Sequence, residues 1–483
     1  MSKISIKKNF IYNTLYEILV IISPLITAPY VSRIFEADGV GVYSYTSAVA
    51  SYFTMFAALG IKSYGQREIA RHRDNPQQAS KLFWELELLC ISTTFLSLLI
   101  WCLVIIFSTE YTAYYAVLTV TVAATAFDIS WFWKGQEQYK FIVIRNSAVK
   151  IIGIIILFVF VREKNDMLLY ISLIAISGLI GNISMWANLS KYLVKIDRKT
   201  LSVKKHLSQT MVYFIPTVAT SIYTVLDKVM LGWIVNSEIE NGYYEQATKL
   251  INICKTLVLS INTVVSARLS FLFSKEMHDE IKEKMKAVVN FLLLIAIPVT
   301  LGLIGVASNF VPWFFGDGYE KTITVVYIMS PLLIIIGISN CLGSLYFVPS
   351  GQRARSNKAI IAGGLTNLFF NTFLIYLFQS SGAAIATVTA EIVITVMYLY
   401  MAKDYFNASC ILKYSWKRLI SAGFMLAVVI VLKSIIEEPL LLIIAQVGLG
   451  AAVYAVCLIA LRDKLVTENL SKIFKSIFKR KGN

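Results

Sequence analysis

Fourteen long apolar segments fill this chain, and they restrict the possible folds more than any motif does. The hydrocarbon core of a bilayer is about 30 Å thick, and a helix of roughly 20 residues crosses it. Because the segments are long and continuous, they indicate helices and not strands. The expected fold class is therefore all-α, a polytopic membrane protein with about 14 transmembrane helices. The spans are predicted at 10–32, 40–62, 83–107, 112–133, 141–161, 168–190, 209–236, 243–270, 287–310, 322–349, 357–378, 380–403, 416–436 and 439–461.

The basic residues between these spans alternate from loop to loop. Most of the 45 Lys and Arg lie at the N-terminus, in or at the edges of the loops after even-numbered spans, and in the C-terminal tail. The other loops hold Arg33, Arg162, Lys164, Lys321 and Lys433. Since Lys and Arg accumulate in cytoplasmic loops, both termini are expected in the cytoplasm of a bacterial cell, with the protein in its cytoplasmic membrane.

Composition excludes several classes of function. The net charge of +16 follows the membrane loops and no soluble basic domain exists, so no nucleic-acid partner is expected. The chain has no Walker A motif, no Asp-x-Asp pair and no His/Glu cluster, so an ATPase, a sugar-nucleotide transferase and a metal site are all disfavoured. No resident cofactor or metal is expected. The chain is predicted to be a secondary transporter or lipid translocator, not an enzyme.

The loops divide the chain into four parts. The basic linker after span six predicts an N-terminal lobe at 1–208 and a C-terminal lobe at 209–403, with six spans each and the same orientation. Spans thirteen and fourteen occupy 404–463. The tail at 464–483 alternates apolar and basic residues at helical spacing, which favours an amphipathic helix on the membrane surface, in contact with membrane lipids.

Ionisable residues within the spans are the candidate site residues, because charge in hydrocarbon is costly and is usually retained for a function. Lys150 and Lys255 lie roughly 14–18 Å deep at 1.5 Å per residue, one in each lobe, and are predicted to line a wet cavity. Arg145 and Lys249 are further cations expected to contact the substrate along its path, and Lys228 is a fifth candidate. A cavity lined by cations favours an anion such as phosphate or pyrophosphate.

Four carboxylates are candidates for coupling transport to an ion gradient. Glu391 lies deep enough to need a cation or a proton, and Asp227 is a second candidate, with a local pair to Lys228 as the simpler interpretation. Asp128, near the end of span four, is expected to pair with Arg145 or Lys134. Glu17, in span one, is the fourth candidate. The ion-coupling candidates are Glu391, Asp227, Glu17 and Asp128.

For the histidines and for two tryptophans we predict no role in a functional site. His72, His206 and His278 fall in basic loops and are expected to be solvated. Trp131 and Trp133, at the end of span four, are expected in an interfacial aromatic belt.

Several stretches together resemble one family. They are Pro29–Arg33, Gly39–Thr46, Tyr64–Ala70, Phe127–Phe132, Arg145-Asn146 with Lys150, Leu226–Gly232, Phe315–Tyr319, and Gly382–Thr387 with Glu391. The pattern resembles the Wzx-type oligosaccharide repeat-unit flippases, the polysaccharide transporters of the multidrug/oligosaccharidyl-lipid/polysaccharide exporter superfamily, over nearly the whole chain.

The resemblance implies two six-helix lobes with two extra C-terminal helices. It implies that an undecaprenyl-diphosphate-linked oligosaccharide is moved from the cytoplasmic to the outer leaflet by alternating access, for capsule, O-antigen or exopolysaccharide synthesis. A proton or sodium gradient is the expected energy source, and a polysaccharide polymerase and glycosyltransferases are the expected protein partners.

Three alternatives stay open. A peptidoglycan-precursor lipid flippase also needs cations in its cavity. A multidrug and toxin exporter shares the fold, but its cavity should be rich in carboxylates, whereas deep lysines match or outnumber deep carboxylates here. A membrane-embedded glycosyltransferase or ligase would need a catalytic extracytoplasmic loop, and the corresponding loops are short and sparse.

Overall fold

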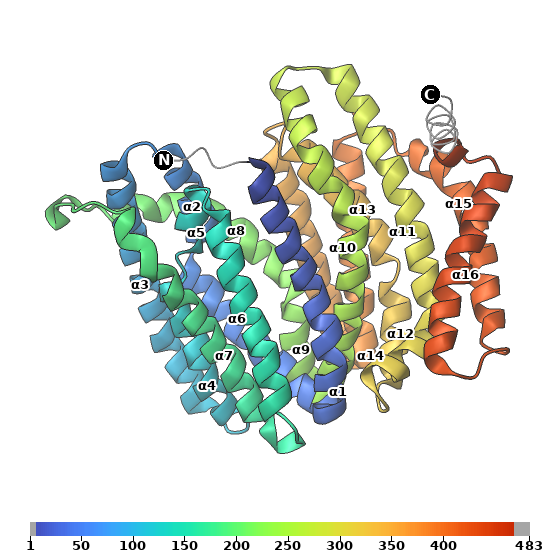
Figure 1. Ribbon diagram of the computed structural model, residues 1–483, viewed down its shortest axis with the longest axis horizontal. Coiled ribbons are helices and arrows are strands. Elements are labelled where there is room, and N and C mark those ends of the chain that lie inside the picture. The colour runs from blue at the N-terminus through green and yellow to red at the C-terminus, as the bar shows by residue number, and fades with distance from the viewer. Residues whose placement is uncertain (1–5, 468–483) are drawn as a thin grey trace, which may run out of the picture. The chain divides into compact units, whose positions relative to one another are not determined.

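The computed structural model describes residues 6–467, without the side chains of residues 6–17, 223, 263 and 264, and this part of the chain is helical and free of strands (Figure 1). The first helices are α1 (Ile6–Ala58), α2 (Ile61–Arg71), α3 (Pro76–Phe107), α4 (Thr112–Ala123), α5 (Ser130–Gly135), α6 (Tyr139–Phe160), α7 (Met167–Ser184), α8 (Lys204–Thr224) and α9 (Leu226–Val235). The others are α10 (Glu238–Ser274), α11 (His278–Phe315), α12 (Glu320–Met329), α13 (Leu332–Leu342), α14 (Arg353–Met401), α15 (Ser409–Leu432) and α16 (Pro439–Ala460). Short 3-10 turns and one π-helical turn (Gly343–Phe347) connect them.

The protein is a multi-pass membrane protein. Within the described residues, 9 helices are long and apolar enough to cross a membrane, or up to 12 if each sharply bent pair is one span. Two of the long helices, α1 with 53 residues and α14 with 49, each cover two of the predicted spans. A straight helix of that length would extend about 75–80 Å, far beyond a hydrocarbon core of about 30 Å. The all-α fold is confirmed, while the count of fourteen stays a prediction.

Each of these two long helices is broken at a single residue with positive φ, Glu36 in α1 and Gln379 in α14. After Gln379 the chain folds back on itself, since a Cβ built on Gly382 would lie 1.8 Å from the carbonyl oxygen of Leu374. A lysine side chain contacts each break: Lys321 Nζ donates to Gln379 Oε1 at 2.5 Å.

The corresponding lysine at the α1 break is Lys164. Its ammonium lies 2.7 Å from Glu36 Oε2 and 2.9 Å from Asp38 Oδ2. Lys164 and Lys321 belong to the sparse set of basic residues outside the rich loops, and their contacts give both of them a structural role at a helix break.

The chain forms two compact units, residues 1–242 and 243–483. The predicted division after residue 208 rests on the number of spans per lobe and stays a prediction. In the first unit, α1 packs against α3, α4 and α6, and α7 packs against α4 and α6. In the second unit, α11 packs against α13, α15 and α16.

Two predictions about the part of the first unit near α2 and α5 are wrong. His206 is buried, and its imidazole lies 2.9 Å from Glu85 Oε2 on one side and 2.9 Å from the Tyr64 hydroxyl on the other. Trp131 and Trp133 are each only 1% exposed, so they are core residues and not members of an interfacial belt. α2 packs against α5, which carries both tryptophans, and against α8, which carries His206, so these side chains are buried.

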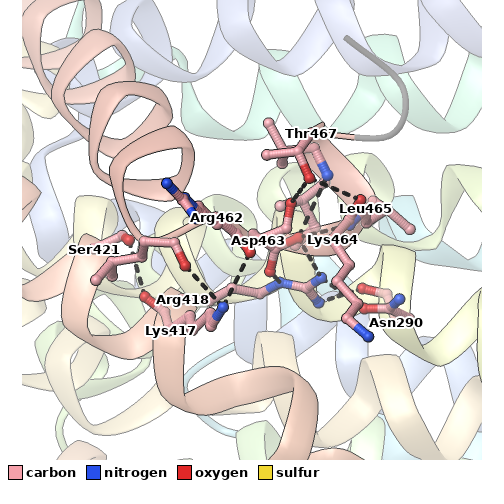
Figure 2. Close-up of polar contacts among 12 residues, drawn as sticks. Asn290, Lys417, Arg418, Ser421, Arg462, Asp463, Lys464, Leu465 and Thr467 are labelled. Atoms are coloured by element: carbon pink, nitrogen blue, oxygen red, sulfur yellow. Dashed lines mark hydrogen bonds and ion pairs between the residues drawn. The ribbon is translucent and has the colours of Figure 1, made fainter. Parts of the chain in front are cut away.

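A buried arginine organises the end of the second unit. Arg418 of α15 is 1% exposed and forms an ion pair with Asp463, Nε to Oδ2 at 3.3 Å, while its guanidinium donates to the carbonyl and side-chain oxygens of Asn290 in α11. Figure 2 shows these side chains converging. Asp463 also accepts from the backbone N–H of Leu465 and caps the turn that follows α16. One side chain thus connects α11, α15 and the chain beyond α16.

The predicted amphipathic tail lies mainly outside the described residues, which end at residue 467. α11 begins at His278, so it extends the span predicted at 287–310 toward its N-terminal side.

The close approach at Gly382 makes the α14 hairpin sensitive to a single methyl group. We expect Gly382→Ala to lower the yield of folded, monodisperse protein and its melting temperature, because the added Cβ has no space beside the Leu374 carbonyl. Gly448→Ala in α16 is the matched control, since a Cβ there would meet nothing within 4 Å. Thermal unfolding of both variants in detergent measures this, and equal melting temperatures would contradict the proposed packing.

Candidate functional site: a cationic cavity in the first unit

α6 carries a polar face within an apolar sequence. Arg145, Asn146 and Lys150 follow one another at helical spacing and share a face with Gly153. The opposite face is lined by exposed apolar side chains, among them Ile144 at 53% exposure. A membrane helix with this division has one face suited to lipid and one suited to water or a polar ligand.

The polar face of α6 lines a cavity of about 690 Å³. The other walls come from the first half of α1, from the segment around α5 and from α7. Its polar and charged lining residues are Ser23, Thr27, Asp128, Ser130, Lys134, Tyr139, Arg145, Asn146, Lys150, Tyr170, Ser177 and Asn182. All of these residues belong to the first unit.

Two glycines leave space on the cavity wall. A Cβ built on Gly178 of α7 would meet nothing within 4 Å, and one built on Gly153 would meet only Ser177 Oγ at 3.9 Å. Small residues at these two points keep the neighbouring helices from filling the cavity with side chains.

Three cations and one carboxylate line this cavity. Arg145 donates through Nη2 to Asn146 Oδ1 of the same helix. Lys150 is half-buried, five residues further along α6, which is about 8 Å at 1.5 Å per residue. Lys134 follows in the α5 segment. The prediction that Arg145 and Lys150 are stations on one path is consistent with their shared cavity.

The carboxylate, Asp128, has a different partner from the expected ones. Its Oδ2 lies 2.7 Å from Lys62 Nζ of α2, and its Oδ1 accepts from the Ser130 backbone N–H at 3.1 Å. The expected pair with Arg145 or Lys134 is replaced by this one because α2 packs directly on α5. Asp128 therefore caps α5 and neutralises Lys62, and its role in ion coupling stays a prediction.

Sequence reasoning missed Glu87 of α3. Its side chain is 1% exposed, and its Oε1 has no hydrogen-bond partner among the described residues. It interacts electrostatically with Asp128. The signal in the sequence was the pair Glu85 and Glu87 at the start of an apolar span, where exposure at the membrane surface was the simpler assumption.

The second unit holds its own charged group. Glu391 of α14 is 6% exposed, has Ser339 as a side-chain hydrogen-bond partner and interacts electrostatically with the half-buried Lys255 of α10. Lys249, on the same helix, forms an intrahelical ion pair with Glu245, Nζ to Oε1 at 3.5 Å.

The remaining candidates lie elsewhere. Asp227 is 1% exposed in the first turn of α9 and interacts electrostatically with Tyr52, and Lys228 follows it. Neither lines the cavity described above. The side chain of Glu17 lies outside the described residues.

The arrangement is suited to binding an anion. Within residues 6–467, no group of three or more His, Cys, Asp and Glu side chains is placed to hold a metal ion. Arg145 and Lys150 line the cavity with N–H donors, which form short, strong charge-assisted hydrogen bonds to phosphoryl oxygens.

Lys150 should govern anion binding in this cavity. We expect Lys150→Gln to weaken binding of inorganic pyrophosphate by about tenfold or more, because a hydrogen bond to a charged group contributes about 1.5–3 kcal/mol. Lys140→Gln is the matched control, since Lys140 lies on the same helix, is exposed and does not line the cavity. Calorimetric titration of the purified protein measures both, and equal losses would refute a specific site.

Gly178 tests the cavity by its volume. Gly178→Leu should fill the space beside α6 and reduce pyrophosphate binding, while Gly178→Ala should bind as the wild type does and raise the melting temperature slightly, because Ala favours a helix over Gly. Binding that is unchanged in the Leu variant would show that the anion binds elsewhere.

Comparison with known proteins shows similarity to one family, to one curated relative and to two solved structures. Residues 6–273 match the family described as "Polysaccharide biosynthesis protein". The chain is 24% identical over 410 residues to the "Putative O-antigen transporter" of Escherichia coli K12, covering 83% of this chain and 98% of that one. Among solved structures, the lipid II flippase MurJ in an inward closed conformation superposes with a TM-score of 0.72 at 19% identity, over 95% of this chain and 99% of that one.

A multidrug resistance MATE family transporter in its inward-facing conformation has a TM-score of 0.53 at 13% identity, over 81% of this chain and 96% of that one. These two structures show that the chain has the fold that such flippases and exporters share.

Proposed function

This chain belongs to the polysaccharide biosynthesis protein family, and from that premise we propose that it is a flippase for lipid-linked oligosaccharides. Its substrate is an undecaprenyl-diphosphate-linked oligosaccharide repeat unit, moved from the cytoplasmic to the outer leaflet for synthesis of a cell-surface polysaccharide. The translocation proceeds by alternating access, and the protein is a transporter, not an enzyme.

The observation that carries this proposal is the cavity with Arg145 and Lys150 inside a membrane domain. A lipid diphosphate brings negative charge into a region where an uncompensated ion costs several kcal/mol. Cations fixed on α6 offset that cost, while the lipid tail remains in the bilayer. The name of the E. coli relative, an O-antigen transporter aligned over nearly its whole length, supports the same substrate class.

We assign roles in this proposal to seven of the predicted residues. Arg145 and Lys150 hold the diphosphate in the first unit, and we assign Lys255 and Lys249 to anion passage in the second unit. Lys228 is a subsidiary station. Glu391 and Asp227 are candidates for coupling the transport to a proton or sodium gradient.

The alternatives differ in the charge that their cavities must accept. A peptidoglycan-precursor lipid also carries a diphosphate, so it stays the second candidate substrate. A multidrug exporter handling cationic drugs is disfavoured, because Lys134, Arg145 and Lys150 line the cavity and its carboxylate, Asp128, is already paired with Lys62.

The cellular setting follows from the same proposal. The protein lies in the bacterial cytoplasmic membrane with both termini in the cytoplasm, as the distribution of Lys and Arg favours. A polysaccharide polymerase and glycosyltransferases of the same route are the expected protein partners.

Reconstitution in liposomes tests the function directly. We expect the wild type to transfer a fluorescent undecaprenyl-diphosphate oligosaccharide between leaflets. Lys150→Ala/Lys255→Ala should lose at least nine-tenths of that rate, because a barrier higher by about 1.4 kcal/mol or more slows the transfer tenfold or more. Lys140→Ala is the control for a general loss of surface charge.

The assay separates the alternatives. If transfer survives the double substitution, the flippase function stands and the proposed role of Lys150 and Lys255 is refuted. Transfer of a peptidoglycan precursor alone would favour the second substrate, and efflux of small organic cations without lipid transfer would refute the proposal.

A further inference from the structure

Glu87 is a buried carboxyl group that the proposed transport path does not use. It lies on α3 with a side chain that is 1% exposed, and its Oε1 accepts no hydrogen bond from the described residues. It does not line the cavity. A buried polar atom without a partner is uncommon in a folded protein and calls for an explanation.

Glu85, two residues earlier on the same helix, is a buried carboxylate whose oxygens do have partners. Glu85 is also 1% exposed, but it contacts Lys205 at 2.8 Å and His206 at 2.9 Å and accepts from the Ser202 backbone N–H at 2.8 Å. Two residues further along a helix, Glu87 points away from that network. The contrast shows that burial of a carboxylate in α3 is tolerated where donors are supplied.

The charged and titratable groups around Glu87 come from few of the packed elements. α3 contacts α1, α2, α4, α8 and the turn Ala124–Phe127. α4 contains no Asp, Glu, Lys, Arg or His, and the half of α1 after its break contains one, Asp38, which is paired with Lys164 at 2.9 Å. The groups that face this region are Lys62 of α2, Asp128 after the turn, Cys90 of α3, and the Glu85 network with Lys205 and His206 of α8.

Among these groups, the cations are already engaged. Lys62 lies 2.7 Å from Asp128, and Lys205 and His206 contact Glu85. An ionised Glu87 would therefore add a second negative charge near Asp128, while these cations already pair with other carboxylates. Burial and a neighbouring carboxylate both favour the protonated form of such a group.

We propose that Glu87 binds a proton and, through Asp128, couples this proton to occupancy of the cavity by an anion. Asp128 belongs to both sets of contacts, since it lines the cavity and interacts with Glu87. An anion beside Arg145 and Lys150 raises the energy of every carboxylate near the cavity, and uptake of a proton from water by Glu87 lowers it. By linkage, protonation of Glu87 strengthens anion binding by the same factor.

This inference rests on the anion-binding role proposed above and specifies its partner ion. It predicts that anion and proton enter together: one proton is taken up from solution for each anion bound when Glu87 starts ionised, and it is returned when the anion leaves. No covalent bond changes, and the proton exchanges with water of the cavity by way of Asp128.

Calorimetry in buffers of different ionisation enthalpy counts the protons. Inorganic pyrophosphate is titrated into the full-length protein in detergent, for the wild type, Glu87→Gln and the exposed control Glu110→Gln. We expect proton uptake that depends on pH in the wild type and the control, and that falls by up to one proton per anion in Glu87→Gln. Affinity should also lose most of its pH dependence in that variant.

The outcomes separate this inference from the function it rests on. Pyrophosphate binding with the same proton uptake in Glu87→Gln would overturn the role of Glu87 and leave the cationic cavity intact. No binding by the wild type would overturn both. Asp128→Asn with intact folding should also reduce the proton uptake, because it removes the carboxylate that connects Glu87 to the cavity.

Infrared spectroscopy provides a measurement that needs no ligand. A protonated carboxyl group has a carbonyl band apart from those of carboxylates and amides. The wild type should show such a band that Glu87→Gln lacks and that disappears as the pH rises. Spectra without any difference at all pH values would overturn the proposal, whatever the transport assay shows.

Discussion

A charge placed in hydrocarbon must be compensated, and most of this structure can be understood from that requirement. No water is available inside the bilayer to solvate an ion or a free backbone group, so the chain is helical and each ionised side chain meets a partner or a cavity. Arg418 meets Asp463 and Asn290, Glu85 meets Lys205 and His206, and Glu391 interacts with Lys255. These contacts hold helices together that apolar packing alone would leave free to slide.

The cavity in the first unit differs from these pairs, because its lining holds Lys134, Arg145 and Lys150 beside a single carboxylate, Asp128. Arg145 and Lys150 of α6 line a cavity of about 690 Å³. Space remains there because glycines on α6 and α7 add no side chains to it. On the proposed function, Arg145 and Lys150 compensate the charge of the substrate's diphosphate when it enters the cavity.

The sequence predicted the elements better than their contacts. Hydropathy and the length of a bilayer crossing determine helices, so the all-α fold and even the separation of spans at 32–40 and 378–380 followed from local information. The partners of Asp128 and His206 did not, because Lys62 and Glu85 are distant in the chain and only the packing of α2 and α8 brings them close. Glu87 was missed for the same reason, since burial of a residue near the end of a span depends on the helices that cover it.

The ion pair between Arg418 and Asp463 has a practical consequence for anyone who modifies this protein. Hydropathy suggests that the folded part ends with α16 at Ala460, and a fluorescent reporter or affinity tag would naturally be joined there. Asp463 lies just beyond that point, so such a junction would delete the counter-ion of a buried guanidinium three residues after the last helix. The first junction that respects the interior comes after Thr467, whose hydroxyl still bonds to the Asp463 carbonyl.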